Sequence, residues 1–264
     1  MNTVIFTDLD GTFLNHDDYS FSESSQSRKK VLQKGIPLIF NTSKTKIEVE
    51  LLQNDVGINE PFIIENGAAI FFPKGYKNLD FSTFEQLENY YVFTLGITYD
   101  EILNFYNKYK DIYWLKGFSD MTLDEVSNFT GLPKNKAELS KVRGFTEPFF
   151  IEDESQIQKL SLEAKKYGIK ITKGGRFYHL MGVNQDKGMA IKKAIEIFEK
   201  LFDGKVSSIG LGDGENDIEM FKNVDIPIII KNHKDEYLDF DSSNVQKSTF
   251  KGAKGWNEMV LKNV

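Results

Sequence analysis

Two carboxylates stand close together near the start of the sequence, in the run Asp8-Leu9-Asp10-Gly11-Thr12. The run follows an apolar segment, 4–6, that is typical of a buried strand, and side chains two apart on a strand point to the same side. Carboxylates this close repel one another unless a cation neutralises them, and ligation by oxygen alone favours Mg²⁺. A plain turn is the alternative, because Asp-Gly is a common turn pair.

A second acidic run, Gly210-Leu211-Gly212-Asp213-Gly214-Glu215-Asn216-Asp217, lies between a predicted strand and a predicted helix. It begins like a dinucleotide-binding loop, but Glu215 occupies the position that such a loop gives to glycine or alanine. It also lacks the alternating ligands of an EF-hand loop. The run places Asp213 and Asp217 at a corner that suits a metal, although either could simply cap the helix.

Two further runs could bind an anion. Thr42, Ser43 and Lys44 follow the second predicted strand, where hydroxyls, a lysine and free helix N–H groups would form an anion cradle. Lys187 stands at the start of a predicted helix, where a cation opposes the helix dipole, so we expect it to serve an anion elsewhere in the fold. An ordinary helix cap and a solvated lysine are the alternatives.

Alternating strands and helices position these four runs. An α/β core with a parallel sheet is therefore predicted from both ends of the chain. The predicted strands are 4–6, 36–40, 62–64, 69–72, 206–210 and 226–230. The predicted helices are 21–34, 45–55, 188–202 and 215–222, the second opened by a capping box of Thr45 and Glu48.

The middle of the chain, about 78–186, is richer in Tyr, Phe and Asn and predicts a separate α+β unit. Its predicted helices are 100–110, 122–130, 135–141 and 154–167, and its predicted strands are 148–151, 169–172 and 177–181. The simplest architecture is an α/β core with this second domain inserted into it.

Composition excludes several classes of protein. The 264 residues carry a net charge of −6, so a basic nucleic-acid footprint is not expected. The absence of cysteine removes disulfides, zinc–thiolate sites and cysteine nucleophiles. No segment approaches the roughly 18 apolar residues of a membrane span, and no targeting segment is visible. We therefore expect a soluble, cytoplasmic protein with no membrane partner; its oligomeric state stays open.

Taken together, the four runs resemble the motifs of the haloacid dehalogenase (HAD) superfamily of phosphotransferases. The resemblance implies a Rossmann-like HAD core, 1–82 and 187–264, and an inserted α+β cap of the C2B-like type, 83–186. It implies that Asp8 is the nucleophile, that Asp10 is the acid and base, and that Thr42 and Lys187 hold the phosphoryl group. The implied Mg²⁺ ligands are Asp8, Asp10 through its backbone carbonyl, Asp213 and, nearby, Asp217.

Segments 64–68, 117–121, 143–148 and 174–180 extend the likeness along the chain, because they resemble mannosyl-3-phosphoglycerate phosphatases. This resemblance implies hydrolysis of that substrate to mannosylglycerate and phosphate. Only Arg28, Arg143 and Arg176 are arginines, and the last two fall in these segments, where their planar fork would suit the glycerate carboxylate. The residues expected to contact the substrate are Ser43, Lys44, Glu65, Asn66, Gly67, Arg143, Arg176, His179 and Asn216.

Three alternatives stay open from the sequence. The substrate could be glucosyl-3-phosphoglycerate or another sugar phosphate of the kind used by Cof-like phosphatases. A sugar phosphomutase would share the aspartyl-phosphate step, and the first motif does not distinguish it. A non-catalytic binding protein on the same scaffold is the third, although every expected catalytic position is filled.

Overall fold

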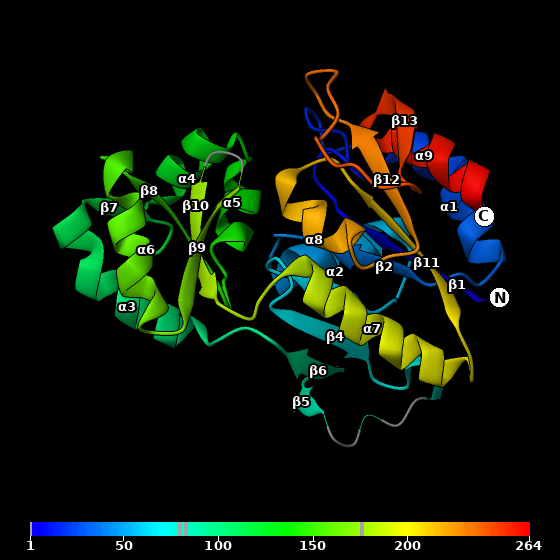
Figure 1. Cartoon of the computed structure of the whole chain (residues 1–264), viewed down its shortest axis with the longest axis horizontal. Helices are drawn as coiled ribbons and strands as arrows, with labels where there is room; N and C mark the ends of the chain where they lie inside the picture. The colour runs from blue at the N-terminus through cyan, green and yellow to red at the C-terminus, as the bar shows by residue number, and fades with distance from the viewer. Residues whose placement is uncertain (1, 79–80, 82–83, 175–176) are drawn as a thin grey trace. The chain divides into compact units, whose positions relative to one another are not determined.

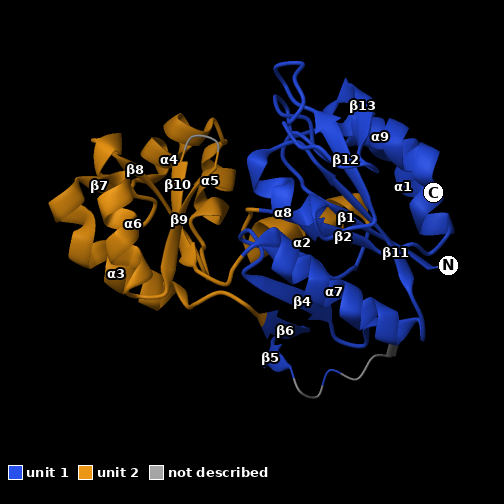
Figure 2. Ribbon diagram, in the orientation of Figure 1, with its two compact units in different colours: residues 1–42, 58–93, 186–264 blue, residues 43–57, 94–185 orange. Residues whose placement is uncertain are grey.

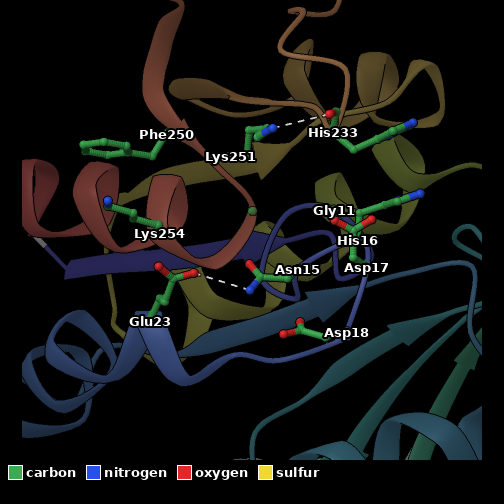
Figure 3. A pocket seen from close by; sticks show the side chains of 11 residues that line it. Gly11, Asn15, His16, Asp17, Asp18, Glu23, His233, Phe250, Lys251 and Lys254 are labelled. Atoms are coloured by element: carbon green, nitrogen blue, oxygen red, sulfur yellow. Dashed lines mark hydrogen bonds between the residues drawn. The ribbon is translucent and has the colours of Figure 1, made fainter.

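The computed structural model describes residues 2–78, 81, 84–174 and 177–264. The chain divides into two compact units, which Figure 2 shows in different colours and which are described separately below. Unit 1 contains residues 1–42, 58–93 and 186–264, and unit 2 contains residues 43–57 and 94–185. The predicted domain boundaries, 1–82 with 187–264 and 83–186, remain a prediction.

Unit 1 is built on a nine-stranded sheet in the order β13-β12-β11-β1-β2-β3-β4-β6-β5. Neighbouring strands from β13 to β3 pair in parallel. The bounds are β1 Asn2–Thr7, β2 Leu38–Asn41, β3 Phe62–Ile64, β4 Ala69–Pro73, β5 Glu85–Leu87, β6 Tyr90–Thr94, β11 Val206–Gly212, β12 Ile226–Lys231 and β13 Gln246–Lys251. Strand β1 lies inside the sheet, and Val4, Ile5 and Phe6 are fully buried, as expected for a parallel strand covered on both faces.

Two hairpins among the described strands are antiparallel within the mostly parallel sheet, β3 with β4 and β5 with β6. β4 pairs with β3 in the antiparallel direction, Phe62 opposite Phe71. The connection between the two strands is only the turn 65–68, which is too short for the crossover that parallel neighbours need.

The helices of unit 1 are α1 Ser25–Gln33, α7 Lys187–Leu201, α8 Ile218–Phe221 and α9 Gly252–Asn263, with short 3-10 turns at Ser22–Ser24, Tyr76–Asn78 and Glu215–Asp217. Helices α1 and α9 lie side by side in Figure 1, although they come from opposite ends of the chain. Helix α7 packs on α8. Among the described residues, no helix combines the length and the apolar character that crossing a membrane requires.

Unit 2 contains a four-stranded antiparallel sheet in the order β7-β8-β10-β9. The strands are β7 Leu115–Gly117, β8 Glu147–Ile151, β9 Ile169–Gly174 and β10 Phe177–Gly182, and the helices are α2 Lys46–Val56, α3 Tyr99–Tyr113, α4 Leu123–Thr130, α5 Lys134–Ser140 and α6 Ile157–Lys165, the last preceded by a 3-10 turn at Glu154–Gln156. One face of the sheet packs on α3 and α6, where Phe105, Leu160 and Phe149 share a core cluster. The next residue of β8, Phe150, points to the other face and contacts Phe129 of α4.

These elements confirm the prediction of an α/β protein with a second, α+β unit. The predicted capping box at Thr45 and Glu48 is present, and the same arrangement opens α3 and α4. Four strands and one helix were not predicted: β5, β6, β7, β13 and the last helix, α9.

Candidate active site

Asp8 is the first residue beyond the end of β1, at the carboxyl edge of the parallel strands. Its backbone N–H donates to Leu211 O of β11 at 2.8 Å, and its side chain is buried. The next turn needs a glycine at position 11, because Gly11 has φ +81° and a Cβ there would lie 2.6 Å from Asp213 Oδ2. The close approach of Gly11 to Asp213 therefore brings the two acidic runs together.

Three aspartates form one cluster at this edge. Asp8, Asp213 and Asp217 each offer a carboxylate oxygen, and the three oxygens lie within 4.8 Å of one another. Burial, followed by the charge of Asp217, raises the pKa of Asp8 to about 7 against the opposing effect of Lys187. Burial and the charges of Asp8 and Asp217 likewise raise the pKa of Asp213 well above its usual value. The cluster therefore holds more negative charge than its surroundings compensate.

This donor set fits a hard divalent cation. The cluster offers carboxylate oxygen only, which is the chemistry that Mg²⁺ and Ca²⁺ prefer. A cation among the three oxygens would also favour the ionised form of Asp8 and Asp213. Thr12 Oγ1 donates to Asp213 Oδ1 at 2.8 Å and fixes that carboxylate from the side of the first motif.

Lys187 binds two members of the cluster. Its Nζ donates to Asp8 Oδ1 at 2.6 Å and to Asp217 Oδ1 at 2.7 Å, and its side chain is only 1% exposed. Although burial alone lowers the pKa of Lys187, Asp217 and Asp8 raise it above the usual value, so the amine is cationic. Asp186 caps the same helix by accepting from Met189 N at 2.7 Å. The lysine predicted to serve an anion away from its own helix thus contacts carboxylates from two other segments.

Asp217 combines the two roles that the sequence left open. While Oδ1 accepts from Lys187, Oδ2 accepts from the backbone N–H groups of Asp213 and Gly214 at 3.1 Å each. The carboxylate therefore closes its own loop and contributes to the cluster at once.

Asp10 lies outside this cluster of three among the described residues. Strand β1 ends at Thr7, so the strand alternation used to place Asp8 and Asp10 on one side does not extend to them. Asp10 is instead half-buried and forms an isolated bridge with Leu14. The charge of Asp10 nevertheless contributes to raising the pKa of Asp8, so the two carboxylates lie close enough to interact.

The turn 65–67 lies against the start of α7. Glu65, Asn66 and Gly67 all have positive φ, and a Cβ on Gly67 would lie 2.0 Å from Asp186 O. Asn66 N donates to Thr42 O at 2.8 Å. The turn therefore links the end of β2, where buried Thr42 lies, to the helix that carries Lys187.

Two of the remaining predicted substrate residues in unit 1 meet at this turn, because Asn216 Nδ2 donates to Asn66 Oδ1 at 3.4 Å. Ser43 and Lys44 begin unit 2, and Lys44 Nζ lies 3.9 Å from Glu48 Oε1 of the following helix.

The family-like segments of unit 2 also come together. Ser119 donates to Glu147 Oε1 from its backbone N at 2.8 Å and from its hydroxyl at 2.6 Å. The ring of Phe118 meets that of Phe177 edge-on at 4.9 Å. Glu147 was not singled out as a site residue, and no local pattern distinguishes a buried glutamate on a strand from an exposed one.

Arg143 and His179 lie in these segments. The Arg143 guanidinium donates to Ser140 O at 2.8 Å and to Ser43 O at 2.9 Å. Burial, and then the charge of Arg143, lower the pKa of His179 to about 3, so its imidazole is neutral. His179 Nδ1 is buried without a hydrogen-bond partner among the residues described. Arg176 lies outside the described residues.

Comparison with known proteins agrees with this geometry. Residues 5–248 match the family model for haloacid dehalogenase-like hydrolases, and the chain belongs to that family. This confirms the predicted HAD core with a cap. In overall fold the structure is similar to that of a Thermoplasma acidophilum protein (TM-score 0.70, 17% identity, 99% of this chain and 98% of that chain). It is also similar to sucrose-phosphatase from Synechocystis sp. PCC6803 (TM-score 0.64, 16% identity, 99% and 98%).

Two curated relatives are much more similar in sequence. A glucosyl-3-phosphoglycerate/mannosyl-3-phosphoglycerate phosphatase of Persephonella marina is 51% identical over 257 residues, which is 97% of this chain and 95% of the relative. A mannosyl-3-phosphoglycerate phosphatase of Pyrococcus horikoshii is 34% identical over 87% of this chain and 91% of the relative.

Proposed function

We propose that this chain is a phosphatase that hydrolyses mannosyl-3-phosphoglycerate and glucosyl-3-phosphoglycerate to the glycosylglycerate and phosphate. The observation that carries the proposal is the buried constellation in which Lys187 holds Asp8 beside Asp213 and Asp217. The full-length similarity to the Persephonella marina phosphatase supports the choice of substrate. The sequence-based expectation of a mannosyl-3-phosphoglycerate phosphatase thus stands, widened to include the glucosyl substrate. A small soluble substrate also fits the expected cytoplasmic location.

Asp8 is the nucleophile in the proposed mechanism. One carboxylate oxygen of Asp8 forms a bond to phosphorus as the bond to the glycerate oxygen breaks, which gives an aspartyl-phosphate. Asp10 gives its proton to the leaving oxygen and then accepts a proton from the water that attacks the same phosphorus. The second displacement releases phosphate and restores Asp8. Asp10 suits this exchange because its carboxylate lies close enough to interact with Asp8, yet it is not one of the three clustered acids that would hold a cation in the described structure.

The surrounding groups keep Asp8 ionised and offset charge. Lys187 lowers the pKa of Asp8 but does not outweigh burial, which leaves it at about 7, so a bound cation would be needed to keep Asp8 fully ionised. We propose Mg²⁺ as the cation, held by Asp8, Asp213 and Asp217 with the Asp10 carbonyl, and its charge would stabilise the phosphoryl oxygens. Thr42, buried at the end of β2, is proposed to hold a phosphoryl oxygen together with Lys187.

The substrate-binding residues remain part of the proposal. Asn66, Gly67 and Asn216 lie on the turn and loop beside the cluster, and Glu65 is buried in the same turn. We assign the glycerate carboxylate to Arg143 and Arg176, and propose that His179 also contacts the substrate, in the proposed cap 83–186. Ser43 and Lys44 complete the proposed contacts.

Phosphate release from a panel of esters tests the function. With Mg²⁺, the wild-type protein should cleave mannosyl- and glucosyl-3-phosphoglycerate faster than 3-phosphoglycerate or hexose 6-phosphates. Asp8→Asn should fold normally and lose turnover, whereas Asp17→Asn, an exposed acid of the same loop, should keep it. Faster cleavage of hexose 6-phosphates would contradict the substrate, a requirement for a bisphosphate would indicate a mutase, and an active Asp8→Asn protein would contradict the mechanism.

A second series tests the carboxylate contact. Arg143→Lys should raise KM for the glycosyl phosphoglycerates by about tenfold or more, because lysine lacks the bidentate fork. It should change KM for a hexose 6-phosphate little. Arg28→Lys, on helix α1, is the matched control and should change neither. Equal effects of Arg143→Lys on both substrates would contradict the assignment.

A further inference from the structure

The segment that carries Asp8 packs against α9, the last helix of the chain. Trp256 of α9 is fully buried, and its indole Nε1–H donates to Thr7 Oγ1 at 3.1 Å. Its ring also meets Phe13 edge-on, with 5.1 Å between ring centroids. Asn15 Oδ1 accepts from Ala253 N at 3.1 Å in the first turn of the same helix. Helix α9 thus contacts this segment at Thr7, Phe13 and Asn15, on both sides of Asp8.

The bond from Trp256 determines where the Thr7 hydroxyl points. An indole N–H can only donate, so the Thr7 oxygen must accept it and its own proton must go elsewhere. Thr7 Oγ1 lies 2.7 Å from the backbone carbonyl oxygen of Asp8, inside the buried core, and donates to it. The result is a directed relay from Trp256 through Thr7 to Asp8 O.

The relay ends at the Asp8 carbonyl, which lies beyond the hydrogen-bonded part of strand β1. The strand ends at Thr7, and a buried carbonyl without a donor is costly. Thr7 supplies that donor, while Asp8 N is bonded to Leu211 O and Asp8 Oδ1 to Lys187. Three bonds from three segments therefore fix the backbone on both sides of the Asp8 Cα and the end of its side chain.

We infer that Trp256 and Thr7 are positioning residues for the nucleophile: their hydrogen-bond relay fixes the peptide group after Asp8 and so aims its carboxylate at phosphorus. The inference rests on the proposed role of Asp8 as nucleophile, and it does not depend on which phosphate ester is the substrate. Misplacing a reacting group by about 1 Å can cost on the order of 100-fold in rate. The relay should therefore act on kcat and leave KM nearly unchanged.

Three variants separate positioning from packing. Thr7→Val keeps the shape of the side chain but removes the hydroxyl, and should lower kcat by about 10- to 100-fold. Thr7→Ser restores the hydroxyl and should recover kcat to within about threefold of the wild type. Trp256→Phe removes the donor that directs the hydroxyl, together with part of the buried ring, and should lower kcat by about fivefold, the equivalent of one hydrogen bond.

Ser248 provides the matched control. It is buried in unit 1, its Oγ accepts from Lys231 N at 2.9 Å and donates to Phe250 O at 2.7 Å, and it does not contact Asp8 in the described structure. Ser248→Ala thus removes an equivalent buried hydroxyl between a donor and a carbonyl. It should lower the melting temperature about as much as Thr7→Val and leave kcat unchanged.

The measurement is kcat and KM for p-nitrophenyl phosphate with Mg²⁺, with the melting temperature of every variant. The inference is supported if Thr7→Val loses kcat at constant KM, Thr7→Ser restores it and Ser248→Ala keeps it. It is overturned if Thr7→Val retains kcat within twofold of the wild type. It is also overturned if Thr7→Val and Ser248→Ala lose kcat to the same extent for the same drop in melting temperature. A wild type that cleaves p-nitrophenyl phosphate but no glycosyl phosphoglycerate contradicts only the proposed substrate; one that cleaves neither contradicts both proposals.

Discussion

Asp217→Asn should destabilise the protein far more than a change of one atom suggests. Both oxygens of Asp217 act as acceptors, Oδ1 from Lys187 and Oδ2 from two backbone N–H groups. Asparagine has one acceptor and one donor end. Whichever way its amide is turned, an NH₂ group faces either the buried ammonium or the backbone N–H groups.

The magnitude follows from burial. Removing one partner of a buried ion pair costs about 3–5 kcal/mol, because the other charge is left uncompensated. Lys187 keeps its second contact, Asp8, at 2.6 Å, so the lower end of that range, about 3 kcal/mol, is expected. Loss of a negative charge from the crowded cluster relieves repulsion and also favours the lower end.

Asp225, which is exposed, provides a comparison in a less demanding environment. Its Oδ2 accepts from both the backbone N and the hydroxyl of Ser208, at 2.8 and 2.7 Å. The single oxygen of an asparagine could accept both, so Asp225→Asn should cost about 1 kcal/mol or less.

Urea unfolding of both variants without divalent cations measures the difference directly. We expect Asp217→Asn to lose about 2 kcal/mol more of its free energy of unfolding than Asp225→Asn. Equal losses, within about 0.5 kcal/mol, would refute the argument that burial and the two-sided acceptor role of Asp217 together set the cost.

Three further results are expected. Gly67→Ala should lower the free energy of unfolding by at least about 2 kcal/mol, because its Cβ would meet Asp186 O. Gly57→Ala, where φ is +76° and the space is open, should lower it by only about 1 kcal/mol. Similar losses in the two variants would contradict the close approach at Gly67. The pKa of His179 is about 3 in the folded protein, so between pH 6.5 and that value only the unfolded chain takes up the proton. From pH 7 to pH 5, the free energy of unfolding of the wild type, measured in urea, should therefore fall by about 2 kcal/mol more than that of His179→Gln. Parallel losses would contradict a neutral buried ring. Mg²⁺ at a hundred times its Kd should stabilise the wild type by about 2.7 kcal/mol in thermal unfolding, and EDTA should reverse this. The proposed cation site would be contradicted if the same Mg²⁺ concentration stabilised Asp213→Asn equally.

The sequence predicted those features that local chemistry determines. The capping box at Thr45 and Glu48 and the acidic loop at Asp213 and Asp217 depend on residues a few positions apart, and both appear as expected. The run at Asp8 does so only in part, because strand β1 ends at Thr7 and Asp10 is not in the cluster found among the described residues. Their assembly into one site was inferred only from the resemblance to a family.

Features stabilised by distant residues could not be predicted. Helix α9 begins with glycines at 252 and 255 and has no local side-chain cap, so its sequence gives a weak helix signal. Its first turn is instead bonded to Asn15, from the other end of the chain. The link between Trp256 and Thr7 is equally invisible, because nothing in either local sequence indicates the other. Strand β5 is exposed throughout and lacks the alternation that identifies a strand.

The order of strands has a consequence for synthesis of the protein. Thr12 and Asp213 share a hydrogen bond although they are 201 residues apart. At translation rates of about 5–20 residues per second, the segment containing Asp8 leaves the ribosome on the order of 10–40 s before the loop that completes the cluster. During that time β1 has its neighbour β2 but lacks β11, and its apolar residues have one uncovered strand edge. The nascent chain should therefore be a substrate for chaperones until its last third is made. A message on which the ribosome pauses before β11 is translated should yield more aggregated protein.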